Sequence, residues 1–147
     1  MRLTFTKRDG KYDDLLIERP DVPPETIQCP KQGIIPHDMV HYAIESTLAS
    51  GGFLTMVADG SAAAFQTQGG DLEEAIERLV ETFQAEMWGG RVPAEDLLAT
   101  YEHACESKGH GTLPVSADDV TRIRERLDEL TAQWTDVPVH GSLTVEM

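Results

Sequence analysis

The chain is short of several residue types, and each shortage narrows what it can be. Only two of its 147 residues are cysteine, Cys29 and Cys105, and they form no Cys-x-x-Cys motif. We therefore expect no disulfide framework and a reducing compartment, the cytoplasm. The N-terminus lacks the apolar core of a signal peptide, and no apolar run approaches the roughly 20 residues that span a bilayer. A membrane partner is therefore not expected.

Basic residues are also scarce, because 12 lysines and arginines stand against 26 aspartates and glutamates, which gives a formal net charge of -14. A field of this sign repels phosphate backbones, so a nucleic-acid partner is not expected either. The chain is nevertheless 40% hydrophobic and 26% charged, which is the ordinary composition of a globular protein. Its length suits a single domain, and we expect one over residues 1–147.

Both ends of the chain have the alternation of apolar and polar residues that is typical of β-strands. Residues 2–8 alternate, the dipeptide Asp9-Gly10 suits a two-residue hairpin turn, and extended character resumes over residues 11–18. Residues 26–29 are a candidate third strand, and residues 143–147 alternate again. A strand at the C-terminus needs a sheet to join, and the N-terminal hairpin is the natural host.

Helical periodicity predicts about four helices between these ends. They are expected from Pro36 to Gly51-Gly52, from Asp71 to Gly89-Gly90, from Pro93 to Gly109 and from Ser116 to Trp134. The pairs Asp71/Glu74 and Ser116/Asp119 have the spacing of capping boxes. The apolar run Phe53–Ala58 suits either a helix or a strand. The predicted fold class is α+β, with a small antiparallel sheet built from both ends of the chain and about four helices on one side.

The last of these helices carries a narrow apolar stripe. Its members alternate spacings of three and four residues, as in a coiled-coil seam: Val120, Ile123, Leu127, Leu130 and Trp134. We favour packing against a neighbouring helix of the same chain, because the stripe is short. A homodimer formed through this last helix is the alternative.

The first helix has the most distinctive chemistry. At about 100° per residue, His37, His41 and Glu45 lie on one flank of its apolar stripe. Two histidines four residues apart converge on one ion in the zincin motif His-Glu-x-x-His. The sequence therefore makes His37 and His41 candidate ligands of a divalent metal such as zinc. Asp38 and Glu45 are then the candidate catalytic carboxylates, one of which acts as general base.

Two histidines do not complete a metal site. Glu45 lies about 12 Å along the helix axis from His37, which is too far for it to share a single ion comfortably. A third ligand has to come from elsewhere, and the helix that starts at Pro93 offers three groups: Glu102, His103 and Glu106.

A purely structural interpretation accounts for the same residues and stays open. In it Asp38 stabilises the helix N-terminus, His41 forms a hydrogen bond with Glu45 one turn on, and His37 is a half-buried polar residue. This interpretation needs no ligand.

Residues 35–45, Ile-Pro-His-Asp-Met-Val-His-Tyr-Ala-Ile-Glu, followed by Gly51-Gly52-Phe53, carry a resemblance. The stretch resembles a family of small uncharacterised bacterial proteins with a Pro-His-Asp-Leu-Val-His pattern. The resemblance covers about residues 1–60 and implies a short β-hairpin followed by a mostly helical chain. Met39 stands where leucine is expected and Ala43 where valine is common, and the polar trio is unchanged. The family has no assigned activity, so the resemblance implies none.

Two functional hypotheses follow. The first is a non-enzymatic binding or regulatory module, since no complete catalytic set is visible in the sequence. The alternative is a metal-dependent hydrolase that uses the His37-Asp38-x-x-His41 helix. Apart from a divalent metal in the second hypothesis, no cofactor is expected.

Overall fold

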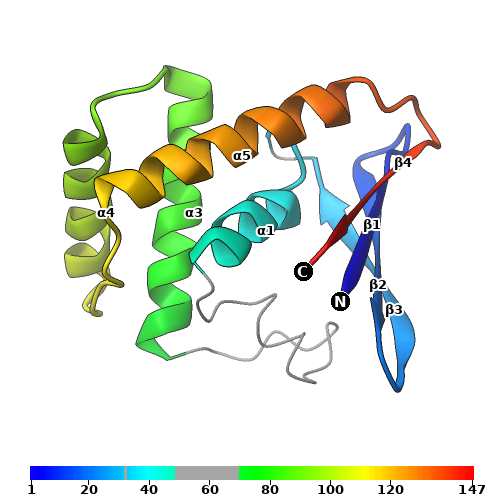
Figure 1. Cartoon of the computed structure of the whole chain (residues 1–147), viewed down its shortest axis with the longest axis horizontal. Coiled ribbons are helices and arrows are strands. Elements are labelled where there is room, and N and C mark those ends of the chain that lie inside the picture. The colour runs from blue at the N-terminus through cyan, green and yellow to red at the C-terminus, as the bar shows by residue number, and fades with distance from the viewer. Residues whose placement is uncertain (32, 49–69) are drawn as a thin grey trace.

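The computed structural model describes residues 1–31, 33–48 and 70–147. Within these ranges the strands form one antiparallel sheet, composed of β1 (Arg2–Thr6), β2 (Tyr12–Arg19), β3 (Val22–Pro30) and β4 (Ser142–Glu146). Their spatial order is β3-β2-β1-β4, so the C-terminal strand pairs with the first strand of the hairpin (Figure 1). The predicted α+β class, with a sheet built from both ends of the chain, is confirmed.

The hairpin between β1 and β2 has a different connection from the predicted two-residue turn at Asp9-Gly10. Thr6 pairs with Asp14, one residue beyond the partner that a two-residue turn would give it. The observed register sets Phe5 opposite Leu15, and both side chains are fully buried. With the shorter turn, Phe5 would face Asp14 instead. Burial of the apolar pair decides the register, and the predicted turn is wrong.

β3 is the outer strand beside β2, and it is longer than the strand predicted over residues 26–29. It contains Pro23 and Pro24, which have no backbone N–H to donate. Proline is tolerated on an edge strand, where one side has no ladder to complete, and at a bulge. Both conditions hold here, because the register between β2 and β3 shifts opposite these two prolines. Asp21, with a φ of 59°, lies in the short connection from β2. The segment that the prolines interrupt in sequence is therefore one edge strand, with an irregular register where the prolines lie.

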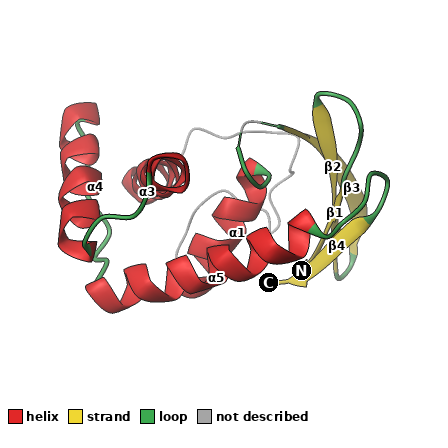
Figure 2. Ribbon diagram, turned by 90° about the horizontal axis from the view of Figure 1, so that it is seen from above, coloured by secondary structure: helices red, strands yellow, loops and turns green. Residues whose placement is uncertain are grey.

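The helices of the described residues are α1 (His37–Leu48), α3 (Asp71–Gly89), α4 (Ala94–Lys108) and α5 (Ala117–Thr135). Figure 2 shows them on one side of the sheet, with α1 and α5 nearest to it and α4 farthest away. α1 packs on α5, α3 and β3, so it lies at the centre of the molecule. In the described part of the chain, no helix is both long enough and apolar enough to cross a membrane.

The two predicted capping boxes lie at the N-termini of α3 and α5. At α5 the box is confirmed, because the Ser116 hydroxyl accepts from the Asp119 N–H and the Asp119 carboxylate accepts from the Ser116 N–H. At α3 the prediction is wrong. Gly70 is the N-cap residue, and no side chain caps this helix. The Asp71 carboxylate instead accepts a hydrogen bond from the Gly111 N–H at 3.3 Å, which links the start of α3 to the α4–α5 connection.

The five residues of the predicted seam on α5 are all buried within the chain, where α5 packs on α1 and α4. This confirms that they pack against helices of their own chain, and a homodimer through α5 stays a prediction. The expected end of the first helix at Gly51-Gly52 and the apolar run Phe53–Ala58 lie outside the described residues.

Tyr42 fixes α1 against the sheet and against α5. Its hydroxyl donates to the backbone oxygen of Glu146 in β4 at 3.0 Å and accepts from Nη2 of Arg126 in α5 at 3.1 Å. The Arg126 guanidinium also lies over the Tyr42 ring, 5.3 Å from its centroid. The Tyr42 side chain is buried, and both hydrogen bonds are partly shielded from water. They hold the helix that carries His37 and His41 in one position.

Replacing Tyr42 with phenylalanine should lower the free energy of unfolding by about 1–2 kcal/mol, because the two hydrogen bonds of the buried Tyr42 hydroxyl are lost. Urea denaturation followed by circular dichroism measures this change. Tyr12→Phe is the matched control, since Tyr12 is 46% exposed. Equal effects of the two substitutions would contradict the role given to the Tyr42 hydroxyl.

Candidate metal centre

The polar flank predicted for α1 exists, and its exposure falls along the helix. The side chain of His37 is 28% exposed, that of His41 is 2% exposed, and Glu45 is completely buried. The flank therefore runs from the surface into the core. Only its first member has substantial contact with solvent.

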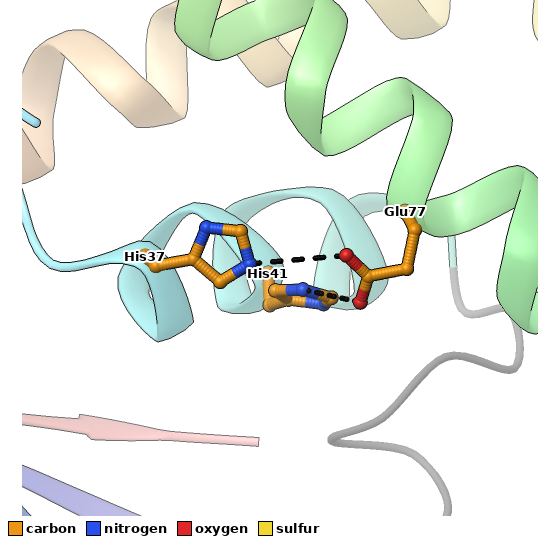
Figure 3. Close-up of side chains that lie close together, drawn as sticks. All are labelled: His37, His41 and Glu77. Carbon is orange, nitrogen blue, oxygen red and sulfur yellow. Dashed lines mark ion pairs between the residues drawn. The ribbon is translucent and has the colours of Figure 1, made fainter. Parts of the chain in front are cut away.

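Glu77 of α3 faces this flank (Figure 3). Its Oε1 lies 2.9 Å from Nε2 of His41, and its Oε2 lies 3.8 Å from Nε2 of His37. The two imidazole rings meet edge to face, with centroids 4.9 Å apart. One potential ligand atom from each of the three residues lies within 4.8 Å of the other two. His37, His41 and Glu77 are called the triad below.

Both ring nitrogens of His41 contact carboxylates. Nδ1 lies 3.0 Å from Oε2 of Glu45, and Nε2 contacts Glu77. An ionised carboxylate only accepts hydrogen bonds, so without a metal His41 donates through both nitrogens as an imidazolium. Burial alone would lower the pKa of His41, but the hydrogen bonds with Glu45 and Glu77 outweigh burial and raise it to about 10.

The carboxylate of Glu77 responds in the opposite direction. Burial alone would raise the pKa of Glu77, but the hydrogen bonds from His37 and His41 hold it well below the ordinary value. One turn earlier on α3, burial and the nearby carboxylates of Glu74 and Glu45 raise the pKa of Glu73. Negative charge is therefore concentrated beside the triad, and a bound cation would be stabilised there.

The spacing of the triad suits a tetrahedral transition-metal ion. Two ligand atoms that each lie 2.0–2.1 Å from such an ion are roughly 3.3 Å apart. The observed separations from Glu77, 2.9 Å to His41 and 3.8 Å to His37, lie on either side of that value. An ion between these atoms would replace the proton on Nε2 of His41. Nδ1 of His41 would keep donating its hydrogen bond to Glu45. A carboxylate is a common acceptor for the second ring nitrogen of a metal-binding histidine.

The structure brings the two predicted ligands, His37 and His41, together, and neither of the predicted catalytic carboxylates belongs to the triad. Asp38 accepts a hydrogen bond from the buried thiol of Cys29 in β3, with 3.1 Å between Sγ and Oδ2. Burial and the charge of Asp38 raise the pKa of that thiol. Glu45 contacts the nitrogen of His41 that faces away from Glu77. Roles of Asp38 and Glu45 in catalysis stay predictions.

The third member of the triad comes from α3, whereas the sequence pointed to α4. The three groups expected from α4 are exposed and are not part of the cluster: Glu102, His103 and Glu106. α4 packs on α3 and α5, one layer away from α1, so this expectation is wrong. Glu77 was missed because its sequence signal is only an acidic residue next to the buried Ile76, a pattern that many surface positions of a helix share.

Glu45→Gln should lower the free energy of unfolding of the chelator-treated protein by about 1.5–3 kcal/mol. The amide keeps the shape of the side chain but removes the charge that stabilises the buried imidazolium of His41. Urea denaturation measures the change. Glu81→Gln is the control, since the Glu81 side chain is 54% exposed and its ion pair with Arg78 should contribute less than about 1 kcal/mol. Similar small losses in both variants would refute a charged His41.

The stability of the metal-free protein should also fall as pH rises above 6.5. The pKa of His41 is raised from 6.5 to about 10 in the folded state, so its contribution is complete below pH 6.5 and is lost as pH rises through about 10. Between pH 6.5 and 8.5, the unfolding free energy should decrease by up to about 1.4 kcal/mol per pH unit relative to a His41→Gln variant. Parallel pH profiles of the two proteins would exclude this linkage.

Comparison with models of protein families gives no match, and searches among curated proteins and among solved structures give none either. The resemblance of residues 35–45 to a family of small bacterial proteins stays a prediction.

Proposed function

We propose that this protein binds one divalent transition-metal ion through His37, His41 and Glu77. The observation that carries the proposal is the convergence of three donor atoms, from two different helices, within 4.8 Å of one another. A buried carboxylate, Glu45, stands behind the central ligand His41.

The chemistry of the donors selects the kind of ion. Two imidazoles and one carboxylate suit zinc or iron(II), whereas calcium and magnesium prefer sites made of oxygen alone. Zinc is the reference ion, because two histidines and one glutamate form a well-known ligand set for it. The proposal therefore predicts a site that discriminates strongly against calcium and magnesium.

The helices that carry the triad support metal binding, because the three side chains need little rearrangement to hold an ion. His37 and His41 are one turn apart on the same helix, so their relative position is set by α1. Glu77 is held against them by the packing of α1 on α3. Apolar residues beside the site are buried on both helices: Val40, Ile44, Ile76 and Val80. A preorganised set of ligands loses little conformational entropy when an ion enters.

Of the two hypotheses drawn from the sequence, only the metal-dependent hydrolase includes a metal ion, but a bound ion is also compatible with a non-enzymatic binding module. A binding module needs no further group, whereas a hydrolase needs a base beside the metal-bound water. In the proposed site Glu45 orients His41 from the side away from Glu77, and Asp38 contacts Cys29. Binding of the ion, without an assigned reaction, is the function that the geometry supports best.

Elemental mass spectrometry of the tag-free protein, followed by zinc titration after chelator treatment, tests the proposal. We expect about one zinc ion per chain in the wild type and none in a His37→Ala/His41→Ala variant. The control double variant, His103→Ala/His140→Ala, changes two exposed histidines outside the triad and should retain zinc.

Two single variants of the triad, with Glu81→Gln as the control, test metal binding with less risk of unfolding the protein. Glu77→Gln should weaken zinc binding by more than about tenfold, whereas Glu81→Gln, one turn further along α3, should not. His37→Ala removes the most accessible histidine of the triad and is the variant least expected to disturb the core. A wild-type protein that takes up no added zinc, or folded triad variants that bind it equally well, would refute the proposal.

A further inference from the structure

The triad provides three protein ligands in the described part of the chain, one fewer than a tetrahedral ion takes. Zinc sites in which all four ligands are protein groups are structural. Sites with three protein ligands keep the fourth position for water or for an exchangeable ligand. With three protein ligands, the triad matches the sites that keep a fourth position for water or for an exchangeable ligand.

The exposure of the three ligands shows from which side that position is reached. His41 is 2% exposed and is held from behind by Glu45, whereas His37 is 28% and Glu77 is 36% exposed. The side of the triad that faces solvent is therefore that of His37 and Glu77, and the core lies behind His41. A small molecule can approach an ion from that side.

We propose that a metal ion held by the triad keeps an exchangeable coordination position, and that this position takes water or a small oxygen donor with at most one negative charge, such as a carboxylate or a hydroxamate. This inference rests on the proposed metal binding. It goes further because it assigns a class of exogenous ligand to the site.

The charges around the ion favour one negative charge on the ligand over two. With His41 neutral on binding the metal, the carboxylates of Glu77 and Glu45 balance the two charges of the ion. Glu73 adds a third carboxylate close to Glu45, and the whole chain carries a formal net charge of -14. A dianion such as hydrogen phosphate meets more repulsion than acetate or acetohydroxamate does.

Cobalt(II) substitution gives a direct readout, because the visible absorption of cobalt changes with its ligands. Cobalt-loaded wild-type protein is titrated with acetohydroxamate and, separately, with inorganic phosphate, and the cobalt content is measured after gel filtration. We expect a saturable change of the visible spectrum with acetohydroxamate, cobalt retained on the protein, and weaker binding of phosphate.

A matched pair of variants tests the electrostatic part. Glu73→Gln removes a carboxylate near the site without touching the triad, and it should tighten the binding of acetohydroxamate by about two- to fivefold. Glu81→Gln removes an exposed charge further along α3 and should leave this binding unchanged.

The outcomes separate this inference from the proposal on which it rests. A chain that binds neither cobalt nor zinc refutes the metal site itself. Cobalt that binds with a spectrum unaffected by acetohydroxamate leaves the metal site standing and overturns the exchangeable position, as does acetohydroxamate that strips the ion from the protein. Tighter binding of phosphate than of acetohydroxamate overturns the assigned class of ligand.

Discussion

The imidazole ring of His41, buried between two carboxylates, is the constraint on which the rest of the site depends. A histidine that is 2% exposed cannot obtain hydrogen bonds from bulk water, so both of its nitrogens need partners inside the protein. Glu45 provides one partner from the same helix, and Glu77 provides the other from α3. Because Glu77 also reaches toward His37, satisfying the buried ring assembles the triad.

The position of α1 makes this arrangement possible. The helix lies between the sheet and the outer helices, and it contacts β3, α3 and α5. Tyr42, the residue after His41, fixes the position of α1 relative to β4 and α5 through its hydroxyl hydrogen bonds. The opposite ends of the chain meet in the sheet, where Met1 and Met147 exchange backbone hydrogen bonds. A site formed by two helices thus depends on contacts between residues far apart in the sequence.

The features that could be predicted from the sequence are those that depend on local periodicity. The helical repeat placed His37, His41 and Glu45 on one flank, and alternation located the strands at both ends of the chain. Predictions failed where distant packing decides. The hairpin register follows the burial of apolar pairs instead of the turn dipeptide, and the third member of the triad, Glu77, depends on how α3 docks on α1. One sequence without its fold has no signal for that docking.

The energetics of the buried groups favour binding over a purely structural role. Taking a charged pair such as His41 and Glu45 out of water costs several kcal/mol per ion, and well-packed apolar residues in such a position are often as stable or more so. Stability alone therefore gives little reason for ionisable side chains there. The same groups are well suited to hold a cation, because the carboxylate of Glu45 orients the ring and that of Glu77 supplies charge. In the metal-free protein the proton on Nε2 of His41 marks the place that the ion would take.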